Sequence, residues 1–436
     1  MPADDDPIRR TELYWGRLER VLVTGRWTPT QGVLRHAGGA YPLLAQRGQG
    51  ARLWDTSGCE YIDWMMGWGP VVLGYRHPAV EAAIAAQLAE GPLFSLTHPL
   101  EIEVGERIQA MVPCADGVAF GKNGSDVLAL AVRLARARTG RELVLHHGYH
   151  GFHDWFMAGV PQCEGMPLAL RATIRGFPYG DLDALGALLD QNAGRVAAVV
   201  MEPAGDFLPP PGYLAGVAEL ARGHGALLVF DEVVTGFRLA RGGAQEAFGV
   251  VPDLACVGKA LANGMPLSAL CGREEFLYTI PRVGYGLTYR GETLSLAAAR
   301  AALDVIANEP VCEHLARVGE ALRAGFAERA QRAGVPGGLI GPAARLTLSL
   351  WPTERLSPLA QNSLLLQELL KRGVLSHGVF LPSYAHGDEE VERTLDAFDA
   401  GLAAVARGRD RGSLAGLLEV PGIAITYGDD EELAKC

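Results

Sequence analysis

The chain has 436 residues, of which 49% are hydrophobic, and its formal net charge is −11. This acidic balance argues against a nucleic-acid partner, because neutralising phosphates requires clustered lysine or arginine. Seven cysteines are scattered without Cys-x-x-Cys spacing, which favours free thiols and a reducing compartment.

The N-terminus begins with the acidic run Met1 to Asp6 and has no basic region followed by an apolar one. No apolar run approaches the ~20 residues that a membrane-spanning helix needs. We therefore expect a cytoplasmic protein with no membrane partner.

Along the chain, an amphipathic helix is expected at about residues 9–23, followed by a glycine-rich stretch and a hairpin-like region from 43–44 to 61–62. The middle of the chain alternates apolar runs with amphipathic stretches, which is typical of a mostly parallel sheet with crossover helices. The runs read as strands are 118–120, 142–145, 196–201, 227–230, 254–257 and 269–271, and the predicted helices are 126–138, 182–190, 213–223 and 293–307.

This pattern predicts an α/β fold with a large domain at 61–305. A smaller α+β domain is expected from both chain ends, residues 1–60 and 306–410, with a peripheral tail at 411–436.

Ligands of open α/β sheets bind at the carboxyl ends of the strands. After the first run, Gly121 to Asp126 combines a permissive turn with helix-capping oxygens, which favours a phosphate but also fits an ordinary capped helix start. After the second run come four histidines, from His146 to His153. Glycines interrupt any helix there, so we expect no metal, and Tyr149 is the better candidate, as a flat surface that stacks on an aromatic ligand.

Two further strand ends carry charged residues. Asp231 follows the run 226–230, where a partly dry carboxylate would pair strongly with a protonated ring nitrogen, and Val233 faces the same side. Lys259 follows the next run. The chain uses 35 arginines and only four lysines, and only lysine can lose its proton and attack a carbonyl. Composition alone leaves open that the four lysines are incidental.

Pyridoxal 5'-phosphate needs four groups in its binding site. These are a turn that binds the phosphate, an aromatic side chain that stacks on the ring, an acid that pairs with the ring nitrogen and an amine that reacts with the carbonyl. The segments that carry these groups also resemble the class III, fold-type I pyridoxal-phosphate aminotransferases, and in particular their glutamate-1-semialdehyde aminomutase-like members. The matching segments, in the expected order, are 68–70, 74–78, 133–136, 148–151, 202–203, 225–238, 242–249, 252–253 and 258–259.

The resemblance implies that Lys259 forms an aldimine with the cofactor, that Asp231 pairs with the pyridinium nitrogen, and that Tyr149 and Val233 sandwich the ring. It further implies that Gly124 and Ser125 bind the phosphate and that Glu202 supports the site near the 3'-oxygen. Thr288 would reach the phosphate of the neighbouring subunit of a homodimer. Trp68, Arg35, Arg290 and Glu292 are weaker candidates for substrate contacts.

Two segments depart from the family pattern. The phosphate turn reads Asn-Gly-Ser-Asp instead of Ser-Gly-Thr-Glu, and the residues after Tyr289 read Arg-Gly-Glu-Thr instead of Ser-Gly-Asn-Pro. Three functions therefore remain open. The leading hypothesis is amino transfer between a small-molecule donor and a carbonyl acceptor through the pyridoxamine form. The alternatives are intramolecular amine transfer by a 2,1-aminomutase and a non-catalytic protein that keeps the fold.

Overall fold

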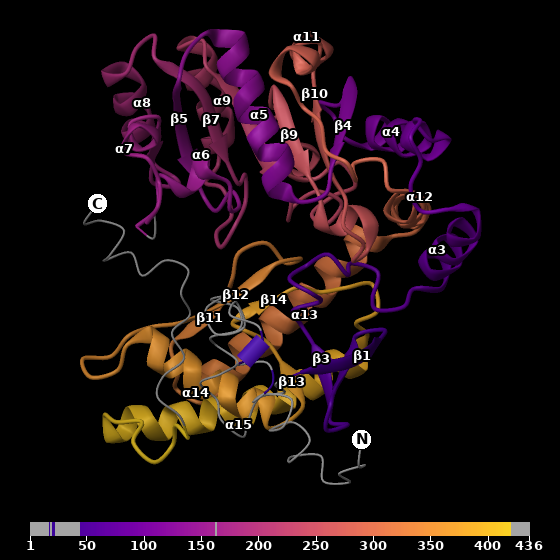
Figure 1. Cartoon of the computed structure of the whole chain (residues 1–436). Coiled ribbons are helices and arrows are strands. Elements are labelled where there is room, and N and C mark those ends of the chain that lie inside the picture. The colour runs from indigo at the N-terminus through magenta and orange to yellow at the C-terminus, as the bar shows by residue number, and fades with distance from the viewer. Residues whose placement is uncertain (1–16, 18–19, 22–43, 162–163, 420–436) are drawn as a thin grey trace. The chain divides into compact units, whose positions relative to one another are not determined.

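The computed structural model describes residues 17, 20–21, 44–161 and 164–419, so Arg35 and most of the predicted helix at 9–23 lie outside the described residues. The chain divides into two compact units (Figure 1). The larger unit contains residues 69–72 and 77–313. Within the described residues, the smaller unit contains the chain up to Trp68, residues 73–76 and the chain from His314 onward.

A seven-stranded sheet forms the centre of the larger unit, with strand order β4-β10-β9-β8-β7-β5-β6. Only β10 runs antiparallel to its neighbours, so the prediction of a mostly parallel sheet is confirmed. The strands are β4 (Gly117–Gly121), β5 (Leu143–His147), β6 (Ile174–Gly176), β7 (Val196–Met201), β8 (Leu227–Glu232), β9 (Leu254–Val257) and β10 (Ser268–Gly272). The sequence analysis missed β6, because three residues are too short to form a recognisable apolar run.

Helices cover both faces of this sheet. Helix α5 (Gly124–Thr139) packs on one face, against residues such as Val229 of β8. Helices α8 (Leu182–Gln191) and α9 (Tyr213–Gly223) pack on the other face, against residues such as Phe230 (Figure 1). Since successive side chains of a strand point to opposite faces, the continuous apolar run of β8 supplies both cores.

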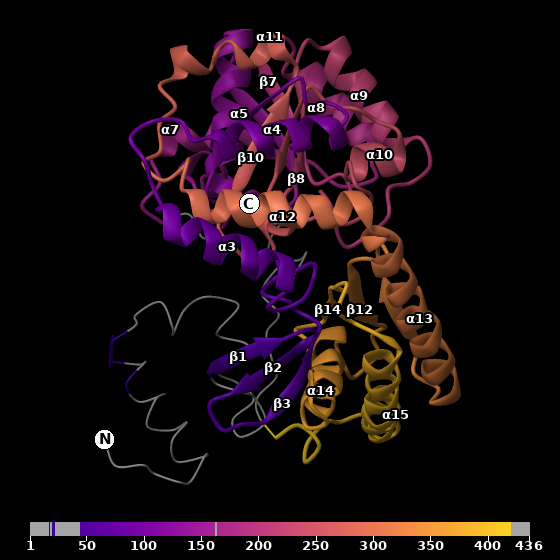
Figure 2. The ribbon, with the colours of Figure 1, turned by 90° about the vertical axis from the view of Figure 1, so that its right-hand side faces the viewer.

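Three longer helices pack together beside the sheet: α3 (Pro78–Glu90), α4 (Pro99–Met111) and α12 (Thr293–Asn308). Figure 2 shows α3 and α12 side by side. Of these only α12 was predicted. The other helices of this unit are short: α6 (Asp154–Met157), α7 (Leu168–Arg171), α10 (Ala244–Phe248), η2 (Lys259–Ala262), α11 (Glu274–Leu277) and η3 (Ile280–Val283).

The smaller unit joins distant parts of the chain through a parallel pair, in which Val374 of β13 lies opposite Ile62 of β3. The hairpin-like region is in fact three antiparallel strands, β1 (Ala45–Gln49), β2 (Arg52–Asp55) and β3 (Glu60–Asp63). The remaining elements are α13 (Val311–Arg332), β11 (Gly337–Ile340), β12 (Leu346–Leu350), α14 (Pro358–Leu370), β13 (Val374–Leu375), β14 (Val379–Phe380) and α15 (Asp388–Arg411).

Leucine and other aliphatic side chains make up most of the core of the smaller unit, and the rings of Phe326 and Phe398 meet edge to face within it at 4.8 Å. Leu414 is buried in the same core, so the first residues of the expected peripheral tail pack against the unit. Within the described residues, no helix is both long enough and apolar enough to cross a bilayer.

Helix α13 contains a glycine that its packing requires. A Cβ atom at Gly319 would lie 1.8 Å from the carbonyl oxygen of Ala343, whereas one at Gly105 in α4 would meet nothing within 4 Å. Alanine normally stabilises a helix interior by about 1 kcal/mol relative to glycine. We predict that Gly105→Ala is neutral or stabilising, and that Gly319→Ala lowers the free energy of unfolding by about 1–3 kcal/mol through overpacking. Guanidinium titrations followed by circular dichroism would measure both, and equal effects would contradict the packing argument.

Candidate active site

The predicted site residues of the larger unit gather at one edge of its sheet. Tyr149, Glu202 and Asp231 follow or end β5, β7 and β8, and Lys259 follows β9. These four strands are parallel, so their carboxyl ends lie at the same edge. The phosphate turn also reaches this edge, because Gly121 at the end of β4 pairs with Ser268 at the start of the antiparallel β10.

Asp231 points to the α5 side of the sheet. Within β8, Leu227 and Val229 pack toward α5, and Asp231 continues this alternate series. Val233 is two residues further on, and a Cβ atom at Gly124 would lie only 2.9 Å from its Cγ2 atom. The first turn of α5 therefore lies directly against the strand end that carries Asp231.

The carboxylate of Asp231 is 5% exposed and is held at both oxygens. Its Oδ1 accepts a hydrogen bond from the backbone N–H of Val233 at 3.1 Å, and its Oδ2 lies 2.8 Å from Nδ1 of His150. Since an ionised carboxylate only accepts, His150 donates from Nδ1. These two contacts fix the rotamer of Asp231 in a largely dry environment.

His150 was not among the residues expected at the site, because the spacing of the histidines from His146 to His153 raises only the question of a metal site. The ring of His150 is fully buried, and its Nε2 atom has no hydrogen-bond partner within the described residues. His146 packs edge to face on Phe156, and burial lowers its pKa to about 3, so it remains neutral. The available signal was the place of His150 in the turn after β5, at the carboxyl edge where ligands bind.

Glu232, the neighbour of Asp231, has a structural task instead. Its side chain points to the other face and accepts hydrogen bonds from Thr235 Oγ1 at 2.7 Å and from the backbone N–H groups of Ala244 and Gln245. Burial raises its pKa, and these hydrogen bonds oppose that shift. The two adjacent acids therefore have different roles. Glu232 holds the start of α10 through hydrogen bonds, whereas Asp231 lies on the side of the sheet that carries the candidate site.

Lys259 has an unusual backbone. Its φ angle is +39°, a value that few residues other than glycine adopt, and Gly258 before it is in extended conformation. Such backbone conformations cost about 1–3 kcal/mol and cluster at functional sites. Lys259 is half-buried in a single 3-10 turn, where the neighbouring residues Ala260 to Ala262 are buried. The fold therefore fixes where this lysine leaves the strand.

The phosphate turn is shaped by close contacts around the start of α5. Asp126 Oδ2 accepts from the backbone N–H groups of Lys122 and Asn123, and the Ser125 hydroxyl accepts from Phe152 N at 3.1 Å. At Gly151, with a φ angle of +91°, a Cβ atom would lie 2.0 Å from Ser125 Oγ. The first N–H groups of a helix have no intrahelical acceptors and attract anions, so this turn fits a phosphate.

Tyr149 and Glu202 are joined at the neighbouring strand ends. Glu202 Oε1 accepts from the backbone N–H of Tyr149 at 2.9 Å, and a Cβ atom at Gly148 would lie 2.7 Å from the same oxygen. Tyr149 is half exposed, and its ring meets Phe156 edge to face at 5.5 Å. One ring face can therefore serve as the predicted stacking surface.

Three of the remaining candidates lie in the loop before α12 or at the start of that helix. Thr288 and Arg290 are exposed in the loop before α12, where Arg290 is 3.4 Å from Glu101. Glu292 caps α12 by accepting from Leu294 N at 2.7 Å. Trp68 belongs to the smaller unit, where its ring packs edge-on against His377.

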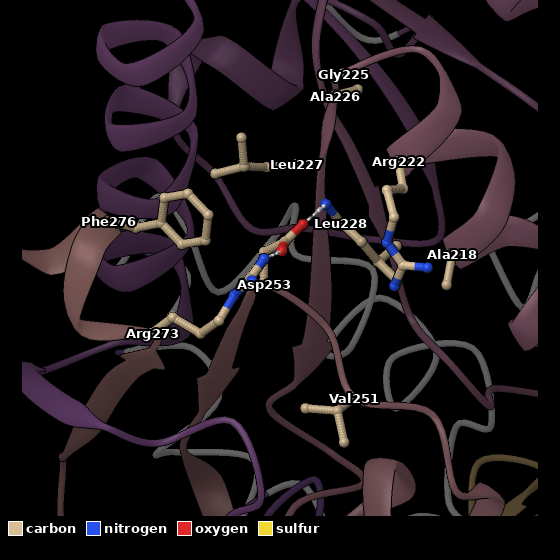
Figure 3. Close-up of a pocket in the computed structure, with 10 residues that line it drawn as sticks. All are labelled: Ala218, Arg222, Gly225, Ala226, Leu227, Leu228, Val251, Asp253, Arg273 and Phe276. Carbon is tan, nitrogen blue, oxygen red and sulfur yellow. Dashed lines mark hydrogen bonds and ion pairs between the residues drawn. The ribbon is translucent and has the colours of Figure 1, made fainter.

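A shallow pocket of about 200 Å³ lies at the opposite, amino ends of β8 and β9 (Figure 3). Its acid, Asp253, accepts from Leu228 N at 2.8 Å and pairs with Arg273. The carboxylate of Asp253 is therefore already paired within the protein. For this reason the carboxyl edge of the sheet, and not this pocket, remains the candidate site.

The side chains at the carboxyl edge fit pyridoxal 5'-phosphate. The first turn of α5 and Ser125 would hold the phosphate, the buried Asp231 would face the ring nitrogen, and Lys259 would reach the carbonyl carbon. Gly124 and Gly148 leave space where side chains would collide with Val233 and Glu202. An aromatic plate, a fixed carboxylate, an amine and an anion site are the groups that this cofactor requires.

Comparison with known proteins agrees with this chemistry. The family described as Aminotransferase class-III matches residues 34–400. The chain is 34% identical to the glutamate-1-semialdehyde 2,1-aminomutase of Syntrophobacter fumaroxidans, over 82% of this chain and 90% of that protein. It is 33% identical to the 3-aminobutyryl-CoA aminotransferase of Cloacimonas acidaminovorans, over 85% of this chain and 91% of that protein.

A solved structure is also similar. The FumI protein of Sphingopyxis sp. MTA144, in its PLP internal aldimine form, superposes with a TM-score of 0.86 and 31% identity, covering 92% of this chain and 98% of FumI. The family match spans most of the chain, and the sheet has the expected mostly parallel arrangement. The chain therefore belongs to the class-III aminotransferases, the fold-type I enzymes that depend on pyridoxal 5'-phosphate.

Proposed function

We propose that the chain is an aminotransferase that moves an amino group between two small molecules, an amine or amino acid and a carbonyl acceptor. The observation that carries this proposal is the buried carboxylate of Asp231, held by His150 at 2.8 Å at the end of the strand beside the one that leads to Lys259. A carboxylate at this position would pair with the protonated ring nitrogen of the bound cofactor.

When bound, pyridoxal 5'-phosphate supplies a carbonyl that captures amines and a ring that accepts the electrons released on proton removal. Lys259 would hold the cofactor through its side-chain amine, and the same amine, when free, would move the proton at the reacting carbon. His150 is a positioning residue, because its Nδ1–H orients the Asp231 carboxylate. Tyr149 and Val233 would pack on the two faces of the cofactor ring, and Glu202, at the end of β7, would support the site.

A homodimer with shared sites is part of the proposal. Large apolar side chains are exposed along residues 88–102: Leu88, Leu93, Phe94, Leu96 and Ile102. This segment adjoins the loop that carries Thr288, since Thr293 N donates to Pro92 O at 2.9 Å and Arg290 contacts Glu101. Exposed apolar groups of this size mark interaction surfaces. They support a second copy seated here, with Thr288 reaching its phosphate.

The scattered cysteines favour a reducing, cytoplasmic compartment, and the five in the described residues are unpaired. The intramolecular alternative, a 2,1-aminomutase, is favoured by the similarity to proteins of that name. The loop before α12 argues against this alternative, because its sequence departs from the family pattern at Arg290 and Glu292. In the structure Glu292 caps α12 and Arg290 contacts Glu101. Trp68, Arg290, Glu292 and Arg35 stay weak candidates for substrate contacts.

We expect Lys259→Ala to abolish covalent attachment of the cofactor and to lower turnover by several orders of magnitude, because no other group is proposed to exchange with the substrate amine. Borohydride reduction followed by peptide mass mapping would measure the attachment. Lys371→Ala, which removes an exposed lysine of the smaller unit, is the matched control. Retention of the lysine-bound absorbance band with full turnover in Lys259→Ala would refute the assignment.

Asp231→Asn should still bind the cofactor but lose roughly a hundredfold or more in kcat, because the amide cannot stabilise a protonated ring nitrogen. Steady-state kinetics and a cofactor titration would separate the two effects. Asp190→Asn, a change at an exposed acid that pairs with His224, is the control. Unchanged kcat in Asp231→Asn would count against the proposed role.

A donor and acceptor screen tests the reaction type. A transaminase should convert the aldehyde form of the cofactor to the amine form when given only an amino donor, and should return to the aldehyde form after a carbonyl acceptor is added. The spectral change between the two forms reports both half-reactions. Complete turnover of one amino-aldehyde without any second substrate, combined with no response to separate donors, would favour the aminomutase instead.

A further inference from the structure

The loop that carries Thr288 is attached at both ends to the residues that lead into the phosphate turn. Near its start, the hydroxyl of Tyr285 donates to the carbonyl oxygen of Phe120 at 2.7 Å. At its end, Nζ of Lys122 lies 2.9 Å from Oε2 of Glu292. Thr288 is exposed between these two attachments.

Lys122 joins two functional segments. Its backbone N–H donates to Asp126 Oδ2 at 3.0 Å, inside the phosphate turn, while its side chain reaches Glu292 and, at 3.2 Å, the hydroxyl of Ser295. Glu292 in turn caps α12 by accepting from Leu294 N and Ser295 N. The ion pair therefore connects the start of α5 to the start of α12.

This pair is shielded from solvent. The side chains of Lys122 and Glu292 are only 14% and 17% exposed, whereas most arginine pairs of the chain are far more open. Water compensates poorly when one partner of a shielded pair is removed. Position 122 is also one of only four lysines in a chain with 35 arginines, and a compact ammonium group can reach a carboxylate and a hydroxyl together.

A loop fixed at both ends samples few conformations, so it loses little entropy when it binds. We propose that Lys122 and Glu292 are positioning residues that present Thr288 to the cofactor phosphate of the partner subunit. This inference rests on the proposed dimer with shared sites, and it assigns the two residues a role in trans: each subunit's pair serves the cofactor bound by the other subunit.

The first test is the dissociation constant of pyridoxal 5'-phosphate, measured by titrating the purified apo dimer and following absorbance. Lys122→Met and Glu292→Gln should each weaken binding on the order of tenfold, as is typical for residues that orient a ligand contact. Glutamine retains an oxygen that can cap α12, so the helix is preserved, and Lys122→Gln provides a second variant if Lys122→Met unfolds. Lys371→Met, which breaks the pairs with Glu368 and Glu419, should leave the affinity unchanged. Unchanged affinity in both site variants would overturn the proposal.

The second test separates an effect in trans from a local one. Heterodimers of differently tagged chains would carry Lys259→Ala in one subunit only, so that borohydride traps the cofactor only in the other subunit. With Glu292→Gln on the same chain as Lys259→Ala, the trapping subunit receives the altered loop, and we expect the weakened affinity. With Glu292→Gln on the trapping chain itself, we expect wild-type affinity.

Equal affinities in the two arrangements, or weakening only in the second, would overturn the positioning role while leaving the proposed function intact. A wild-type dimer that traps no cofactor at Lys259 would overturn the proposed function and this inference together.

Discussion

The candidate site depends on one carboxylate that is kept away from water. Asp231 accepts a hydrogen bond from a backbone N–H and contacts the ring of His150, so the direction of its side chain is fixed. These contacts replace the hydration that a buried polar group loses, which is costly when no partner is present. The buried histidine is therefore as much a part of the site as the acid itself, and the carboxyl edge of the sheet is built around this pair.

The surrounding fold serves to bring short segments close to this pair. The first turn of α5 approaches Val233 so closely that only glycine fits at position 124, and the turn after β5 approaches Ser125 even more closely at Gly151. Lys259 leaves β9 with a backbone angle that most side chains avoid. Close approach and local strain are concentrated where ligand atoms have to be reached, and the buried, regular strands supply the stability that offsets them.

Charged residues outside this edge have different tasks, although some resemble site residues in the sequence. Glu232 is adjacent to Asp231 yet anchors the start of α10, because neighbouring strand residues point to opposite faces. Glu292 caps α12 and pairs with Lys122, so its position near a proposed subunit boundary reflects helix capping as well as any ligand contact. Burial and direction separate these acids, whereas residue type does not.

The sequence by itself determined the alternation of buried strands and crossover helices, and with it the parallel sheet and the edge at which ligands bind. It also placed Asp231, Lys259 and the turn at Gly124 at this edge, because a polar residue directly after a parallel strand lies at the carboxyl end of the sheet. These inferences depend only on the order of apolar and polar residues along short segments, which can be read directly from the sequence.

Only the tertiary structure decided which side chains meet across strands. The pairing of His150 with Asp231 joins residues 81 positions apart, and that of Lys122 with Glu292 joins residues 170 positions apart. Nothing in the local sequence around any of these four residues encodes the partner, since contacts between separate segments arise only when strand order and helix packing are set. The strand ends could therefore be predicted from the sequence, but the hydrogen bonds that fix the acid and the loop could not.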